Sequence, residues 1–181
     1  QDFIWFYKNI KSNDIEIFKN KLKNNFPDIY KGIFNVIISL TSFPERINTV
    51  NQTIESLLNQ EVKANKIILW LAPEQFPNKE ADLPKQLLNL KEKGLIIDWY
   101  HDIRSYKKLI PTLKKYPDSI IITADDDIIY NKTCVKTLIN TYYSNIYNII
   151  ANRITRLYYK EKNLEILPRK LYTKNNNYLP I

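Results

Sequence analysis

The feature that most limits the possible folds is a regular alternation of short apolar runs with longer amphipathic segments. The apolar runs are rich in Ile, Leu and Val and have the length of a strand, which favours strands buried on both faces of a sheet. The runs predicted to be strands are residues 33–40, 66–71, 95–100, 119–124 and 148–154. Strands separated by helices form βαβ units, so we predict an α/β protein with a mostly parallel sheet flanked by helices.

The segments between these runs carry the signals of helices. Helices are predicted over residues 41–60, 85–94, 105–116 and 132–147. Ser42 and Glu45 match a capping box at the start of the first helix, and Gly94 is predicted to end the second. Pro111 lies inside the third helix, where it is predicted to produce a kink.

The predicted domain organisation is one core with an extension at each end. The divisions are a helical extension over residues 1–32, a core over residues 33–159 and an irregular tail over residues 160–181. The extension is predicted to be helical because Ile15, Phe18 and Leu22 fall at helical spacing. The chain begins with Gln1 and contains no Met, so we expect it to be a segment or a processed product.

Composition excludes several classes of protein. The single Cys134 rules out an internal disulfide framework and a cysteine-rich zinc site, and the single His101 rules out a metal centre with several histidines. The only glycines are Gly32 and Gly94, so neither a GxGxxG nor a Walker A loop exists. This argues against nicotinamide dehydrogenases and P-loop nucleotidases. No apolar run approaches the roughly 20 residues that span a bilayer.

The charge of the chain points to anionic partners. The net charge is +8, which favours nucleotides or anionic lipids. A composition rich in Lys, Asn and Ile, as an AT-rich genome produces, explains the lysine count equally well. Most of the 13 tyrosines fall at positions that a core explains, so we predict no nucleic-acid partner.

Polar clusters follow three of the predicted strands, at the edge where open α/β sheets bind ligands. They are residues 41–46, 101–108 and 125–127. The sharpest signal is the triplet Asp125, Asp126 and Asp127, because adjacent carboxylates repel one another unless a cation lies among them. Mg²⁺ and Mn²⁺ prefer such oxygen ligands and often share them with substrate phosphates. A solvated acidic turn is the alternative.

Cations in two of these clusters occupy unfavourable helix positions. Arg46 is predicted in the first turn of a helix, where its charge opposes the helix dipole and a bound anion would offset that cost. Lys107 and Lys108 are also predicted in a first turn, within reach of a phosphate. A solvated lysine pair is the better explanation of these two residues taken alone.

Three segments, taken in order, resemble a family of bacterial GT-A-type glycosyltransferases that occurs near capsule and lipopolysaccharide genes. They are VIISLTSFPERI (Val36–Ile47), KIILWLAPEQFP (Lys66–Pro77) and SYKKLIPTLKKYPDSIIITADDDIIY (Ser105–Tyr130). The resemblance implies a Rossmann-like GT-A fold. It also implies transfer of sugar from a nucleotide-diphosphate sugar to a carbohydrate or lipid-linked acceptor, in surface polysaccharide or glycolipid synthesis.

The same resemblance implies roles for particular residues. The triplet would be the DxD motif, which binds Mn²⁺ or Mg²⁺ through Asp125, Asp126 and Asp127. The implied donor-binding residues are Thr41, Ser42, Arg46, Lys108, Asp125 and Asp126. Two registers stay open, a metal ion on Asp125 and Asp127 or one held chiefly by Asp126.

The chain also departs from the family pattern. Family members often have Gly-Pro where this chain has Arg104-Ser105, and they continue beyond Ile181 into an acceptor-side region that supplies the general base. No catalytic base is therefore predicted, although the resemblance implies inversion at the anomeric carbon. We expect a cytoplasmic protein whose basic surface allows peripheral contact with an anionic membrane. The alternatives are a metal-dependent phosphoesterase and a non-catalytic module that binds nucleotides or other anions.

Overall fold

The computed structural model describes residues 35–144, 149–151, 157–160 and 163–166, together with Asn20, Asn24 and Asn25. These three asparagines are helical, and the rest of the predicted N-terminal helix lies outside the described residues. The chain divides into two compact units, residues 1–146 and residues 147–181. The polar clusters predicted to carry the function all belong to the first unit.

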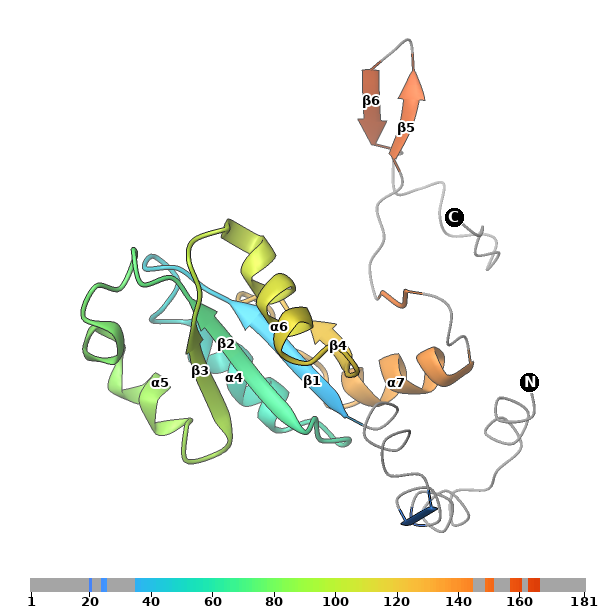
Figure 1. Ribbon diagram of the computed structural model, residues 1–181, viewed down its shortest axis with the longest axis horizontal. Helices are drawn as coiled ribbons and strands as arrows, with labels where there is room; N and C mark the ends of the chain where they lie inside the picture. Colours follow the sequence, from blue (N-terminus) through green and yellow to red (C-terminus); the bar gives the residue numbers. More distant parts are fainter. Residues whose placement is uncertain are drawn as a thin grey trace. The chain divides into compact units, whose positions relative to one another are not determined.

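The first unit contains a four-stranded sheet in the order β3-β2-β1-β4, in which every neighbouring pair of strands is parallel (Figure 1). The strands are β1 (Val36–Thr41), β2 (Lys66–Leu71), β3 (Leu95–Trp99) and β4 (Ile120–Thr123). In the register of the sheet, Ile38 of β1 lies opposite Ile67 of β2 and Ile122 of β4. The predicted α/β class with a parallel, Rossmann-like sheet is confirmed.

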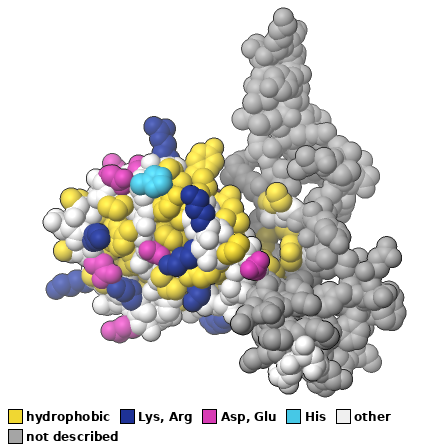
Figure 2. Space-filling model, viewed as in Figure 1, with side chains coloured by type: hydrophobic (Ala, Val, Ile, Leu, Met, Phe, Trp, Pro, Cys, Tyr) yellow, Lys and Arg dark blue, Asp and Glu magenta, His cyan; other side chains and the backbone are white. Residues whose placement is uncertain are grey.

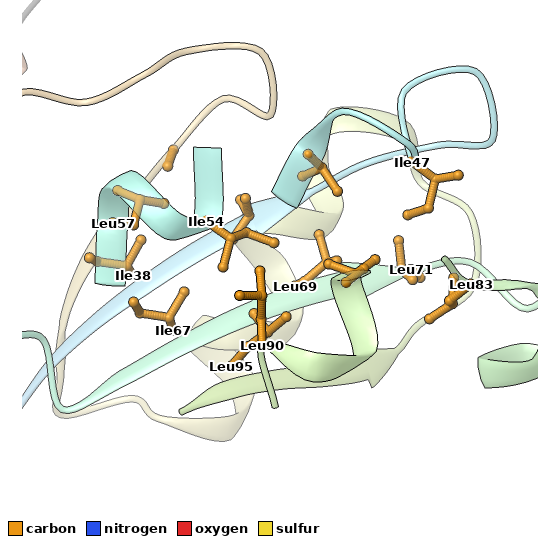
Figure 3. Close-up of a cluster of buried hydrophobic side chains, with 14 of the residues drawn as sticks. Ile38, Ile47, Ile54, Leu57, Ile67, Leu69, Leu71, Leu83, Leu90 and Leu95 are labelled. Atoms are coloured by element: carbon orange, nitrogen blue, oxygen red, sulfur yellow. The ribbon is translucent and has the colours of Figure 1, made fainter. Parts of the chain in front are cut away.

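One face of the sheet packs against three helices. They are α4 (Val50–Leu58), α5 (Lys85–Asn89) and α7 (Cys134–Ser144). Ile54 of α4, Leu87 of α5 and Val135 of α7 are buried in one hydrophobic cluster. The cluster also contains Ile38 and Leu69 from the central strands, as Figure 3 shows. Burying a side chain of this size contributes about 2 kcal/mol, so this cluster is the main source of stability in the described part of the chain.

The opposite face of the sheet carries α6 (Ile110–Lys115), which lies on the near side of the sheet in Figure 1. Ile68 and Trp70 are buried in a second, smaller cluster on this face. The indole N–H of Trp70 donates a hydrogen bond of 2.7 Å to Oγ1 of Thr112, and the hydroxyl of Ser39 lies 2.7 Å from the same atom. Thr112 therefore fastens α6 to the two central strands.

The start of α4 differs from the prediction. The capping box predicted for Ser42 and Glu45 is wrong, because α4 begins at Val50 and no side chain caps its first turn. Residues 44–49 form turns instead. Arg46 therefore precedes the helix, and its charge does not oppose the helix dipole as predicted.

Two other helices are shorter than predicted. The segment over residues 105–116 consists of the 3-10 helix η2 (Arg104–Lys108) followed by α6. Pro111 lies in the first turn of α6, where its missing N–H costs nothing, so the predicted kink is wrong. After α5 the chain passes through turns to Gly94, whose φ of +106° is a conformation that favours glycine.

The second unit contains an antiparallel hairpin of β5 (Leu157–Lys160) and β6 (Asn163–Ile166). The prediction of irregular structure from residue 160 onward is wrong for β6. Local pairing of two short strands does not need the continuous apolar runs by which buried strands were recognised. Residues 149–151 are not a strand, so the strand predicted over residues 148–154 is wrong there, and its remaining residues lie outside the described ones.

The described helices are all short. The longest is α7, with 11 residues. None of the helices in the described part of the chain has both the length and the apolar character needed to cross a membrane.

Candidate functional site

An open pocket of about 500 Å³ lies at the carboxyl edge of the parallel sheet. The chain segments that follow all four strands contribute to its lining. The lining residues are Thr41, Ser42, Phe43 and Arg46 at and after the end of β1, Gln75 after β2, Asp102, Arg104, Ser105, Lys107 and Lys108 after β3, and residues 124–127 after β4. Because open α/β sheets bind ligands at this edge, the pocket is the candidate functional site.

Asp126 anchors the acidic triplet to the rest of the fold. Its Oδ2 accepts a hydrogen bond of 2.7 Å from the hydroxyl of Ser42, and its Oδ1 accepts one of 2.9 Å from Nη1 of Arg46. Its backbone carbonyl accepts a third bond, of 3.0 Å, from the hydroxyl of Thr53 in α4. Asp126 is only 8 % exposed. Both carboxylate oxygens of Asp126 thus accept hydrogen bonds from other side chains of the chain, which gives Asp126 a structural role.

Arg46 joins the loop after β1 to two members of the triplet. Besides Asp126, its Nη1 donates a hydrogen bond of 2.8 Å to Oδ2 of Asp127. The hydrogen bond to Asp126 and the negative charges of Asp126 and Asp127 raise the pKa of Arg46 above its usual range. The guanidinium also lies 5.3 Å from the centre of the Phe43 ring, a cation–π distance. The anion that we expected near Arg46 is therefore supplied by the chain itself.

Asp125 faces a different cation. Nζ of Lys108, at the end of η2, lies 2.5 Å from Oδ1 of Asp125. The backbone N–H of Asp125 donates a hydrogen bond of 2.8 Å to the hydroxyl of Tyr130. Burial raises the pKa of Tyr130 above its ordinary value. The solvated lysine pair predicted for Lys107 and Lys108 is wrong, because Lys108 pairs with Asp125 and Lys107 is buried.

The loop after β3 is held by a second ion pair. Lys107, whose side chain is 3 % exposed, donates to Oδ1 of Asp102. Asp102 also accepts a hydrogen bond of 2.9 Å from the backbone N–H of Arg104 and one of 3.2 Å from Nε2 of Gln75. The hydrogen bond from Lys107 lowers the pKa of Asp102, with a further contribution from the N–H of Arg104. Arg104 adopts a φ of +54°, which a non-glycine residue tolerates only where its surroundings hold it.

The capacity of the pocket to hold a metal ion depends on two exposed carboxylates. The side chains of Asp125 and Asp127 are 57 % and 52 % exposed, and each carboxylate has one oxygen in a hydrogen bond to a cation. Within the described residues, no group of three or more His, Cys, Asp or Glu side chains is arranged to hold a metal ion. Mg²⁺ in nucleotide sites commonly uses one or two carboxylates plus substrate phosphates, and this pair of carboxylates fits that pattern.

The structure brings the residues implied by the resemblance into one place. Residues lining the pocket include Thr41, Ser42, Arg46, Lys108, Asp125, Asp126 and Asp127. The hydroxyl of Thr41 is engaged within the sheet, since it donates a hydrogen bond of 2.8 Å to the carbonyl of Trp70. Within the triplet, Asp126 is buried while Asp125 and Asp127 are exposed.

Sequence reasoning missed several residues that shape the site. Asp102 and Gln75 are joined by a hydrogen bond in the lining of the pocket, and Thr53 and Tyr130 bind the backbone of the triplet. Asp102 had a usable signal, since it follows the third predicted strand directly. Lys107 was named in the sequence, but its burial was not predicted. Thr53 had no signal, because a mid-helix threonine looks like an ordinary surface residue in sequence.

Comparison with known proteins adds no relative. No model of a known protein family matches the chain. A search of curated proteins likewise finds no match. The likeness to GT-A glycosyltransferases therefore depends on the three sequence segments alone.

Proposed function

We propose that the chain binds the diphosphate of a nucleotide sugar together with Mg²⁺ or Mn²⁺, as the donor-binding part of a metal-dependent GT-A glycosyltransferase. One observation carries the proposal: the triplet meets Arg46 and Lys108 in an open pocket at the carboxyl edge of a parallel sheet. A diphosphate accompanied by a metal ion needs carboxylates for the metal ion and cations for the phosphate oxygens.

The charges that line the pocket support a ligand made of an anion and a cation together. The cationic lining residues are Arg46, Arg104, Lys107 and Lys108, and the acidic ones are Asp102, Asp125, Asp126 and Asp127. A diphosphate alone would meet the repulsion of the carboxylates, and a divalent ion alone would meet that of the cationic groups. A complex of the two adds little net charge, so it suits a pocket whose charges are balanced.

Asp125 and Asp127 are the residues that would hold the metal ion. Both are more than half exposed, whereas the two carboxylate oxygens of Asp126 already accept hydrogen bonds from Ser42 and Arg46. Between the two registers left open by the sequence, this favours the Asp125 and Asp127 pair. When bound, the metal ion would neutralise negative charge on the departing diphosphate.

The chain's own cations would act on the same leaving group. Lys108 and Arg46 lie at the pocket surface with 24 % and 43 % of their side chains exposed, so each can exchange part of its contact with the triplet for a phosphate oxygen. Asp102 is not suited to be the general base, because Lys107 lowers its pKa. The proposal places donor binding on the cytoplasmic side of a membrane. The proposed acceptor is a carbohydrate or a lipid-linked sugar, and the proposed transfer inverts the anomeric carbon.

Thermal unfolding in the presence of nucleoside diphosphates tests the proposal. We expect at least one nucleoside diphosphate, such as UDP or GDP, to raise the melting temperature in a concentration-dependent way with Mn²⁺. Without Mn²⁺ the rise should be much smaller. Asp125→Asn and Asp127→Asn should each reduce this rise. A metal-dependent phosphoesterase would instead hydrolyse simple phosphate monoesters and show no preference for nucleotides. No metal-dependent rise with any nucleotide would contradict the proposal.

A further inference from the structure

An exposed apolar ridge, formed by Tyr106, Leu109 and Leu113, lies beside the pocket on η2 and α6. Tyr106 is 66 % exposed, Leu109 38 % and Leu113 45 %. The N–H of Leu109 donates to the carbonyl of Tyr106 at 3.0 Å, and the N–H of Leu113 donates to the carbonyl of Leu109 at 2.9 Å. Each residue therefore stands one helical turn beyond the last, and the three line one side of the segment.

The ridge is not needed to attach α6 to the sheet. The side of α6 that faces the sheet is formed by Pro111 and Thr112, which are buried. Single exposed apolar residues are ordinary on a protein surface, whereas a contiguous row of large ones marks an interaction site. The apolar ridge therefore requires an explanation outside the packing of the described residues.

The surroundings of the ridge are basic. Residues 104–115 contain five Lys or Arg residues and no acidic residue. Lys107 and Lys108 pair with aspartates of the pocket, and Lys115 pairs with Asp98. Arg104 and Lys114 are the remaining cations of the segment, and Lys114 donates a hydrogen bond of 3.0 Å to the hydroxyl of Tyr100. Figure 2, seen from the side on which α6 covers the sheet, shows hydrophobic side chains with Lys, Arg and some Asp or Glu side chains among them. An apolar row flanked by cations is complementary to a surface whose outer layer carries negative charge and whose interior is apolar.

We propose that the apolar ridge docks on an anionic lipid bilayer. Tyr106, Leu109 and Leu113 would enter the interfacial region, while Arg104 and Lys114 contact anionic headgroups. Tyr is well suited to this depth because its ring is apolar and its hydroxyl is polar. Since η2 also lines the pocket, docking would hold the pocket at the membrane surface. The proposal stands independently of the identity of the ligand in the pocket.

Co-sedimentation of the full chain with lipid vesicles tests the docking surface. One set of vesicles contains phosphatidylcholine alone, and the other contains added phosphatidylglycerol. We expect the wild type to bind the anionic vesicles preferentially. The double variant Leu109→Ser with Leu113→Ser should lower the vesicle partition coefficient by about tenfold or more. Lys114→Gln should lower it by about fivefold on anionic vesicles only.

A matched control and a second variant keep the outcome decisive. Val62→Ser changes an exposed apolar residue between α4 and β2 and should leave vesicle binding unchanged. Tyr106→Ser alters the most exposed member of the ridge and should weaken binding without lowering the melting temperature. Wild-type binding by the serine variants would overturn the proposal. A large fall in the melting temperature of the leucine double variant would also overturn it, because the leucines would then be packed within the chain.

Discussion

The hydroxyl of Ser42 donates a hydrogen bond of 2.7 Å to Oδ2 of Asp126, which lies 84 residues further along the chain. Both residues are buried, at 2 % and 8 % exposure. The bond joins the loop after β1 to the loop after β4, which are neighbouring strands of the sheet. The position of the acidic triplet therefore depends on the β1 loop as much as on β4.

Ser42→Ala is expected to destabilise the fold by about 2 kcal/mol, because it leaves a buried carboxylate oxygen without its donor. Urea denaturation monitored by tryptophan fluorescence measures the change. Ser105→Ala, at an exposed position of the same pocket, is the matched control and should change stability by less than about 0.5 kcal/mol. Equal effects of the two substitutions would contradict the anchoring role of Ser42.

Asp126→Asn and Asp127→Asn are expected to differ in their effects. Asp126 is buried with two side-chain donors, so its substitution should lower the free energy of unfolding by about 2 kcal/mol or more. Asp127 is half exposed, and exposed ion pairs contribute little to stability. Asp127→Asn is therefore expected to change ligand binding far more than folding. A larger loss of stability from Asp127→Asn than from Asp126→Asn would contradict this division of roles.

Asp102 is expected to make stability depend on pH below neutrality. Because Lys107 holds the pKa of Asp102 below its unfolded value of about 3.9, the pairing stabilises the fold above that pH and is lost as the pH falls through the lower, folded value. The difference in unfolding free energy between wild type and Asp102→Asn should therefore be largest near neutrality and shrink below about pH 4. A difference that stays constant across this range would show that Asp102 is not the group responsible.

Lys108→Gln is expected to change metal and nucleotide binding in opposite directions. Lys108 occupies one oxygen of Asp125, so its removal should strengthen the binding of Mn²⁺ alone. The same substitution should weaken the binding of a nucleoside diphosphate in the presence of Mn²⁺, because a phosphate contact is lost. Equilibrium dialysis gives the first affinity and calorimetry the second. Lys114→Gln, outside the pocket, is the control, and a parallel fall in both affinities for Lys108→Gln would contradict the exchange of partners.

The sequence predicted the four strands of the parallel sheet well because their pattern is local. The run at residues 66–71 was predicted with the observed boundaries, because Lys66 is followed by five apolar residues, a pattern that suits a central strand of a parallel sheet. Ser42 was assigned to a helix cap because the capping pattern is also local. Its real partner, Asp126, is distant in sequence and becomes visible only when the parallel order of β1 and β4 is known.

Lysine burial shows a second limit of sequence reasoning. Lys107 and Lys108 are adjacent and chemically identical, yet Lys107 is buried against Asp102 and Lys108 reaches the pocket. Both lysines belong to η2, where adjacent side chains point about 120° apart, so only one of the two can face inward. The sequence predicted one continuous helix over this segment and did not indicate which lysine that would be. The position of the triplet in a polar site was easier to predict, because three adjacent carboxylates after a buried strand need partners wherever the chain places them.

The most direct test of the central claim is calorimetric titration of a nucleoside diphosphate into the full chain with and without Mn²⁺. We expect one binding event per chain that requires Mn²⁺ and is weakened at least tenfold by Asp125→Asn or Asp127→Asn, at melting temperatures close to that of the wild type. Val62→Ser should bind as the wild type does. Nucleotide binding that is equally tight without Mn²⁺, or that survives both aspartate substitutions, would contradict the claim that the acidic triplet holds a metal ion and a diphosphate together.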